Sequence, residues 1–320
     1  MKELLANSRV IAIVGRGKNV GKTTTLNHIL KLYSDEEGIS ITSIGYDGED
    51  IDNITETIKP RIYIYPNTYF ATTTFGLKHS NFLYEIIEKT NIKTALGNVV
   101  IGVAKGYGNI LLCGPSIKND IQCVIDKFKN LSNNKIFIDG AFNKSMQAEP
   151  YLSDAMVLAT GAAYSTNIEE IVLDTKYIIS LYSREYLYQD KISDLYIYDA
   201  LFGDIAEFYK KISSNNTIRL KGSLTDNFIK ELLYTNKKVK DIVLVVDNPT
   251  ICFLSRKIFE YAKVKNISIR FLHTTEIKLI TINPVSINGI FLDSEKLIND
   301  LKEITDIAIY DVVKEAKGEN

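Results

Sequence analysis

The chain has 320 residues, of which 45% are hydrophobic and 24% charged, a balance typical of soluble globular proteins. Its 38 Lys and Arg residues nearly cancel its 39 Asp and Glu residues, and the net charge of −1 argues against a nucleic-acid partner. The longest apolar runs are too short to span a bilayer, and the N-terminal residues lack the pattern of a signal peptide. We therefore expect a cytoplasmic protein that does not associate with membranes.

The first half of the chain alternates short apolar runs with helical stretches, which predicts a mostly parallel α/β sheet flanked by helices. Two apolar runs around the Lys105–Asn109 turn additionally predict an antiparallel hairpin. Helices are expected over 23–33, 82–89 and 121–131. The expected strands span 10–15, 39–46, 61–65, 98–104, 109–114, 135–141 and 155–161.

A similar alternation continues after about Thr175. The expected strands there are 177–183, 217–222, 241–247, 267–273 and 278–284, with helices near 226–234 and 255–263. We therefore expect two domains, a first domain over 1–175 and a smaller C-terminal α/β domain over 176–320, each long enough to bury its own core.

The run VIAIVGRGKNVGKTTTLNHIL (10–30) contains a buried strand, a glycine-rich turn and an amphipathic helix in that order. Backbone N–H groups of such a turn and the positive end of the helix dipole hold phosphates, and glycines let the backbone approach them closely. Lys22 is expected to reach the β- and γ-phosphates, and the Thr23 hydroxyl to ligate Mg²⁺. The predicted nucleotide-binding residues are Gly15, Gly17, Lys18, Asn19, Val20, Gly21, Lys22, Thr23 and Thr24.

Two acidic positions follow expected strands and are candidates for holding the metal. Asp139 comes at the end of KIFIDGA, the position of a Walker B aspartate, and Asp47 follows the second strand together with Glu49 and Asp50. Both loops are expected at the same sheet edge as the phosphate loop. We assign Thr23, Asp47 and Asp139 as metal partners and Lys22 and Asp139 as catalytic residues, although Asp-Gly pairs also form ordinary turns.

Asp247 is a rival to Asp139 because it too ends an apolar run, but it lies in the expected second domain. The three threonines 72–74 are near enough to a strand end to contact phosphate, or simply form a hydroxyl-rich loop. No obvious arginine finger can be named in cis, and Arg16 is a weak candidate for one. Turnover is therefore expected to be slow until a partner supplies that group.

The phosphate loop has five residues between Gly15 and Gly21, one more than in G-x-x-x-x-G-K-[ST], and this longer spacer resembles the loop of dethiobiotin synthetase. A second resemblance is carried by the segments KNVGKTTTLN (18–27), ITSIGYDGEDID (41–52), LCGPS (112–116), FIDGAF (137–142), SDAMVLATGA (153–162) and TINPVSINGIFLD (281–293). With these segments, nearly the whole chain resembles the P-loop accessory subunit associated with adenosylcobalamin-dependent lysine 5,6-aminomutase.

The second resemblance implies a P-loop NTPase-like fold and an ATP-binding subunit of a reactivase that restores the aminomutase during lysine fermentation. It also implies two protein partners, a MutS-like ATPase subunit and the cobalamin-dependent aminomutase itself, and leaves a homo-oligomer possible. Two other functions stay open at this point. One is a small-molecule ligase or kinase similar to dethiobiotin synthetase, and the other is a nucleotide-switched scaffold that does not hydrolyse its ligand.

Overall fold

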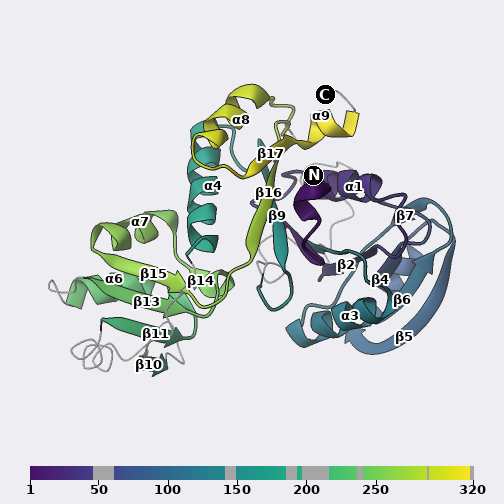
Figure 1. Cartoon of the computed structure of the whole chain (residues 1–320), viewed down its shortest axis with the longest axis horizontal. Coiled ribbons are helices and arrows are strands. Elements are labelled where there is room, and N and C mark those ends of the chain that lie inside the picture. Colours follow the sequence, from purple (N-terminus) through teal and green to yellow (C-terminus); the bar gives the residue numbers. More distant parts are fainter. Residues whose placement is uncertain are drawn as a thin grey trace. The chain divides into compact units, whose positions relative to one another are not determined.

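The computed structural model describes residues 1–45, 61–140, 149–184, 193–196, 216–235, 241–286 and 288–317. It divides into two compact units, one formed by 1–175 together with 276–320 and the other by 176–275. Figure 1 shows the helices and strands of both units, coloured along the chain.

A nine-stranded sheet forms the centre of the first unit. The strands are parallel from one edge of the sheet as far as β4. The next strand, β6, is antiparallel to both of its neighbours, β4 and β5. In spatial order they are β17 (Ala308–Asp311), β16 (Glu276–Asn283), β9 (Ala155–Gly161), β1 (Val10–Gly15), β8 (Ile136–Gly140), β2 (Ser40–Ile44), β4 (Tyr69–Thr73), β6 (Gly97–Ala104) and β5 (Tyr84–Thr94). The expected α/β architecture, a large and mostly parallel sheet flanked by helices, is therefore confirmed.

Helices cover both faces of this sheet. On one face, α1 (Lys22–Leu32) buries Leu26, Ile29 and Leu30 in the same cluster as Ile11 and Ile13 of β1. On the other face, α3 (Lys118–Leu131) packs against alternate residues of β1 and β8. A third cluster joins α4 (Ile168–Tyr182), β16 and α8 (Ser294–Lys302). The alternation of side chains along each strand produces these two buried faces.

Short elements complete the first unit. They are the 3₁₀ helix η1 (Glu3–Leu5), α2 (Thr74–Lys78), α9 (Val312–Lys317) and the small antiparallel pair of β3 (Ile62–Ile64) and β7 (Gly108–Ile110). The side chain of Asn27 on α1 holds β3 in place, because it donates to the Arg61 carbonyl and accepts from the Tyr63 N–H.

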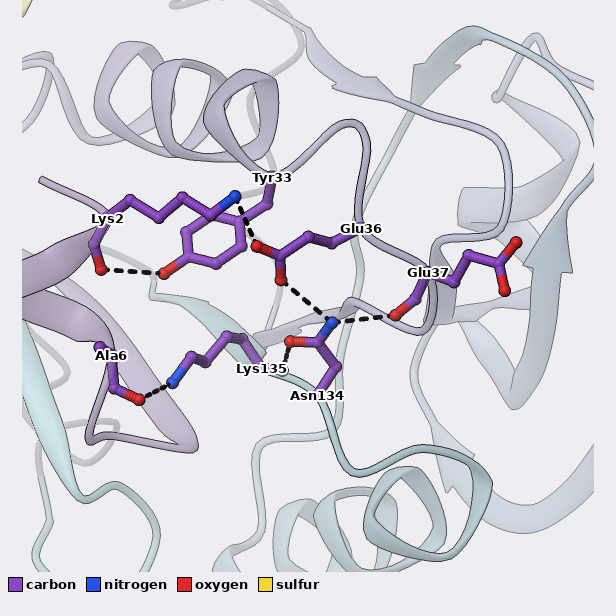
Figure 2. Close-up of polar contacts among 7 residues, drawn as sticks. All are labelled: Lys2, Ala6, Tyr33, Glu36, Glu37, Asn134 and Lys135. Carbon is purple, nitrogen blue, oxygen red and sulfur yellow. Dashed lines mark hydrogen bonds and ion pairs between the residues drawn. The ribbon is translucent and has the colours of Figure 1, made fainter.

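A polar network joins the segments that lead into β1, β2 and β8 (Figure 2). The Glu36 carboxylate pairs with the Lys2 ammonium and accepts a hydrogen bond from the Asn134 side chain at 3.2 Å. Lys135 donates to the carbonyls of Ala6 and Ser8. Burial lowers the pKa of Lys135, and the negative charges of Glu36 and Asp154 oppose that shift. These contacts lie at the amino ends of β1, β2 and β8, so they join the strands at the end opposite to the loop that follows β1.

The second unit has its own parallel sheet, in which the strands follow chain order: β10 (Ser193–Tyr196), β11 (Thr217–Lys221), β13 (Ile242–Val246) and β15 (Ile267–Phe271). Its further elements are α6 (Asp226–Thr235), α7 (Arg256–Val264), the 3₁₀ helix η3 (Pro249–Ile251) and the pair of β12 (Leu224–Thr225) with β14 (Cys252–Phe253). Among the helices of the described ranges, none has the length and apolar character needed to cross a membrane.

The division of the chain differs from the expected domains 1–175 and 176–320. The segment after residue 275 returns to the first unit, where β16 pairs with β9 and β17 pairs with β16. Figure 1 shows β16 running beside β9. The apolar run of β16 is buried between neighbouring strands, and short-range sequence patterns do not specify which sheet such a run joins.

Three local expectations are wrong. The stretch 82–89 was expected to be helical, but 84–94 forms strand β5, which pairs with β6. The expected hairpin of 98–104 with 109–114 does not form, because β6 pairs with β4 and β5 while β7 pairs with β3. The expected strand 177–183 lies almost entirely in α4. In each case the partners available in the folded chain outweigh the local preference.

Candidate functional site

The phosphate loop lies where the chain connections of the large sheet diverge. From β1 the chain crosses through α1 to β2, on the side of β8, whereas from β9 it proceeds through α4 and later to β16 on the opposite side. The crevice at the carboxyl ends of two such strands is the usual ligand site in open parallel sheets. Gly15 and Ala159 are register partners at the ends of β1 and β9, so the loop starts at this switch point.

The loop backbone is shaped for close approach to a ligand. Gly21, the residue before α1, has a left-handed φ of 94°, a conformation that a residue with a Cβ rarely adopts. A Cβ on Gly15 would lie 2.6 Å from Cδ of Lys22, so any larger residue would displace the lysine stem. Asn19 also has a left-handed φ of 58°. The loop therefore combines an unusual backbone path with a lysine packed closely against its first glycine.

Lys22 at the start of α1 contacts the backbone at the end of β8, next to Asp139. The Lys22 ammonium donates to the Gly140 carbonyl at 2.9 Å. The Asp139 carboxylate accepts from the Gly140 N–H at 3.0 Å. Strand β8 is the direct neighbour of β1, and Asp139 is in register with Ile13, two residues before the loop. The two residues expected at one site therefore lie on either side of the Gly140 peptide.

The start of α1 provides further groups that fit a phosphate ligand. The helix begins at Lys22, and its N-cap residue, Gly21, makes no side-chain cap. Its first N–H groups and its dipole therefore favour an anion there. Thr23 and Thr24 lie in the first turn and are half-buried, while Lys18 is exposed. A triphosphate with Mg²⁺ fits this set of N–H groups, ammonium, hydroxyl and carboxylate, and Mg²⁺ would neutralise phosphate charge when bound.

The other acidic candidates have different outcomes. Asp47, Glu49 and Asp50 lie outside the described residues, although β2 ends at Ile44 in register with Gly140. Asp247 lies at the end of β13 in the second unit and pairs with Arg219 at 3.1 Å. It belongs to a different sheet from the phosphate loop.

The threonines of residues 72–74 serve the local fold. The Thr72 hydroxyl donates to the Leu111 carbonyl and accepts from the Cys113 N–H. The Thr73 hydroxyl accepts from the Gly76 N–H and caps α2. These bonds favour the hydroxyl-rich structural interpretation over phosphate contact.

Two residues near the loop were not anticipated from the sequence. Asn283 ends β16, its Cβ lies 3.0 Å from the Cβ position of Gly21, and its amide donates to the Asn19 carbonyl at 3.5 Å. Asp174 of α4 binds the Arg16 guanidinium. The only signal for Asn283 was its place at the end of an apolar run, and the expected domain boundary assigned that run elsewhere. Nothing in the local sequence pairs Arg16 with a residue so far along the chain.

Comparison with known proteins gave no match for this chain among protein-family models, curated proteins or solved structures.

Proposed function

We propose that this protein binds a purine nucleoside triphosphate, ATP, together with Mg²⁺ at the loop between β1 and α1, within a P-loop NTPase-like fold. The observation that carries the proposal is the contact of the Lys22 ammonium with the Gly140 carbonyl next to Asp139, at a switch point of the parallel sheet. Lys22 would exchange that carbonyl for the β- and γ-phosphates. Thr23 and Asp139 would hold Mg²⁺, directly or through water.

We further propose that nucleotide binding serves a reactivase for an adenosylcobalamin-dependent aminomutase, in which a MutS-like ATPase is the second subunit. The support is the sequence resemblance, in which no obvious arginine finger can be named in cis. Among the described residues, Arg16 is bound to Asp174, so stimulation by a partner fits the described contacts. Release of a damaged, tightly held cofactor needs a conformational change with a free-energy source, which a nucleotide-dependent partner supplies.

Substitution of Lys22 tests the nucleotide site. Lys22→Ala should weaken Mg-ATP binding by about 2–3 kcal/mol, because it removes a charge-assisted contact to the phosphates. Isothermal titration calorimetry measures this change, and circular dichroism verifies the fold. Lys31→Ala is the matched control, since Lys31 is an exposed lysine in the last turn of the same helix. Equal affinity in the Lys22 variant and the wild type would exclude the loop as the nucleotide site.

A reconstitution experiment tests the narrower function. Mutase holding inactivated cobalamin is mixed with fresh adenosylcobalamin, Mg-ATP, the ATPase partner and either wild-type protein or Lys22→Ala. Recovery of mutase activity should require both ATP and the wild-type chain. If nothing recovers although every component is folded and nucleotide is bound, the reactivase role is refuted. ATP turnover that rises with a small metabolite rather than with a protein partner would instead favour a synthetase similar to dethiobiotin synthetase.

A further inference from the structure

Arg16 and Asp174 form an ion pair between the phosphate loop and α4 that nucleotide binding alone does not require. The Arg16 Nε donates to one Asp174 carboxylate oxygen at 2.7 Å and its Nη2 donates to the other at 2.9 Å. The Asp174 side chain is only 7% exposed, and that of Arg16 is 29% exposed. Two parallel bonds fix both the distance and the orientation of the groups, as a lysine could not.

The main chain of Arg16 is held by a second element. Its N–H donates to the Ala159 carbonyl of β9 at 2.9 Å. The first residue of the loop after Gly15 is thus fixed to the sheet through its backbone and to α4 through its side chain. A shift of the loop entrance must therefore disturb the backbone bond to β9, and a shift of α4 must disturb the side-chain bonds between Arg16 and Asp174.

Helix α4 is the element on which the chain leaves the first unit. It spans Ile168–Tyr182, and the boundary between the units falls between residues 175 and 176, next to Asp174. The hydroxyls of Thr160 on β9 and Thr175 on α4 are buried and have no hydrogen-bond partner among the described residues. Buried polar groups without partners cost stability.

We propose that Asp174 is a positioning residue that acts through Arg16 and couples occupancy of the phosphate loop to the state of α4. This inference rests on the proposed nucleotide binding. A triphosphate bound beside Gly15 orders the loop and changes the electric field at Arg16, and the two-point bond transmits both effects to α4. A ligand shifts such an equilibrium only through its different affinity for the two states. By reciprocity, loss of the pair must weaken nucleotide binding by the factor with which nucleotide stabilises the pair.

Hydrogen exchange of the full chain with and without saturating Mg-ATP tests the coupling. In the wild type, Mg-ATP should slow exchange in the loop 15–24 and throughout 168–182. In Asp174→Asn the loop should still be protected at saturation, but the response of 168–182 should be lost. The affinity for Mg-ATP should fall about tenfold, within the usual range of coupling between sites. Asp174→Glu, which keeps the carboxylate, should restore part of the response.

Glu169→Gln is the matched control, because it removes an exposed carboxylate from the same helix, and it should respond as the wild type does. If Asp174→Asn does not fold, Arg16→Lys replaces it, since a lysine keeps the charge but loses the two-point geometry, and it should show a reduced response. An unchanged α4 response in the folded variant overturns the inference, as does a wild-type loop that is protected without any effect on α4. Absence of loop protection in the wild type refutes the proposed nucleotide binding, and the inference with it.

Discussion

Two aspartates with the same local sequence context have different surroundings in the fold. Asp139 and Asp247 each end an apolar strand, but β8 lies directly beside β1, whereas β13 belongs to the sheet of the second unit. Asp139 is adjacent to the carbonyl that binds Lys22, and Asp247 binds Arg219 instead. A position at the end of a strand is therefore a weak guide to a metal ligand. Whether that strand lies beside β1 decides whether its aspartate is near the loop.

Asp139→Asn should weaken Mg-ATP binding more than it weakens ATP binding in EDTA, because an amide retains hydrogen bonding but loses the charge that Mg²⁺ prefers. A loss of at least tenfold in the Mg²⁺-dependent part, about 1.4 kcal/mol, is expected from removal of one charged partner. Calorimetry with and without EDTA measures the difference. Asp247→Asn is the control and should leave both affinities unchanged. If the ATP affinity of the Asp247 variant alone no longer depended on Mg²⁺, the assignment of Asp139 as the metal partner would be contradicted.

Glu36 provides a pH-dependent contribution to stability. The hydrogen bond from Lys2 is the main cause that holds its pKa below the ordinary value of 4.5, and the Asn134 amide adds to it. The folded-state pKa is thus below the unfolded one, so the contribution is complete above about 4.5 and is lost as pH falls through the folded pKa. Because both side chains are partly exposed, Glu36→Gln should cost only about 1 kcal/mol at pH 7.

Chemical denaturation of the wild type and Glu36→Gln between about pH 3 and pH 7, a range that brackets the titration of a carboxyl group, checks this expectation. The difference in the free energy of unfolding should shrink toward the acid end. Glu37→Gln is a suitable control, because only the backbone carbonyl of Glu37 takes part in the network shown in Figure 2. A difference that stays constant over the whole range would exclude Glu36 as the titrating group.

At the scale of elements, the strand, loop and helix at 10–32 were predictable because their signals are local. An apolar run, a glycine turn and a helical repeat occur within one short segment, and the structure has β1 and α1 there. Strand β5 was not predictable in the same way. Its residues EIIEK fit a helical pattern, and antiparallel pairing with β6, the next strand along the chain, makes them a strand instead. Its apolar residues Tyr84, Ile86 and Ile87 are exposed. The sequence therefore has no alternation of buried apolar and exposed polar residues that would indicate an edge strand.

The same reasoning applies to the candidate site. Gly15, Gly21, Lys22 and Thr23 could be assigned from one segment, whereas Asn283 and Asp174 reach the loop only through the order of strands in the sheet. Strand order depends on which buried edges meet during folding, and a single sequence carries little information about it. The residues of the proposed nucleotide site were thus assignable from the sequence, but those that contact the loop from distant segments were not.

For the whole molecule, the return of 276–320 to the first unit makes that segment necessary for the large sheet. It contributes the buried side chains of Leu279, Ile280, Ile282, Leu297, Leu301 and Val312. At roughly 1.5–3 kcal/mol for each buried side chain, their loss matches or exceeds the total stability of about 5–15 kcal/mol that folded proteins have. The first unit is therefore not expected to fold from residues 1–175 alone.

A chain ending at residue 275 should lose hydrogen-exchange protection in β1 and β9, because β9 is left with an unpaired edge. A chain ending at 317 is the control and should behave as the full chain does. Equal protection of β1 in the two shortened chains would show that the first unit is complete without β16 and β17.

The insertion of residues 176–275 between two neighbouring strands also constrains the order of events during synthesis. Strand β9 leaves the ribosome long before its partner β16, and at about 5–20 residues per second the interval is several seconds or more. During that time β9 has one open edge, at which nascent chains are prone to pair wrongly. If the inserted unit folds as soon as it emerges, a compact body replaces about 100 flexible residues and lowers the entropy cost of joining β9 to β16. Early folding of residues 176–275 would then shorten the time during which the open edge of β9 is exposed.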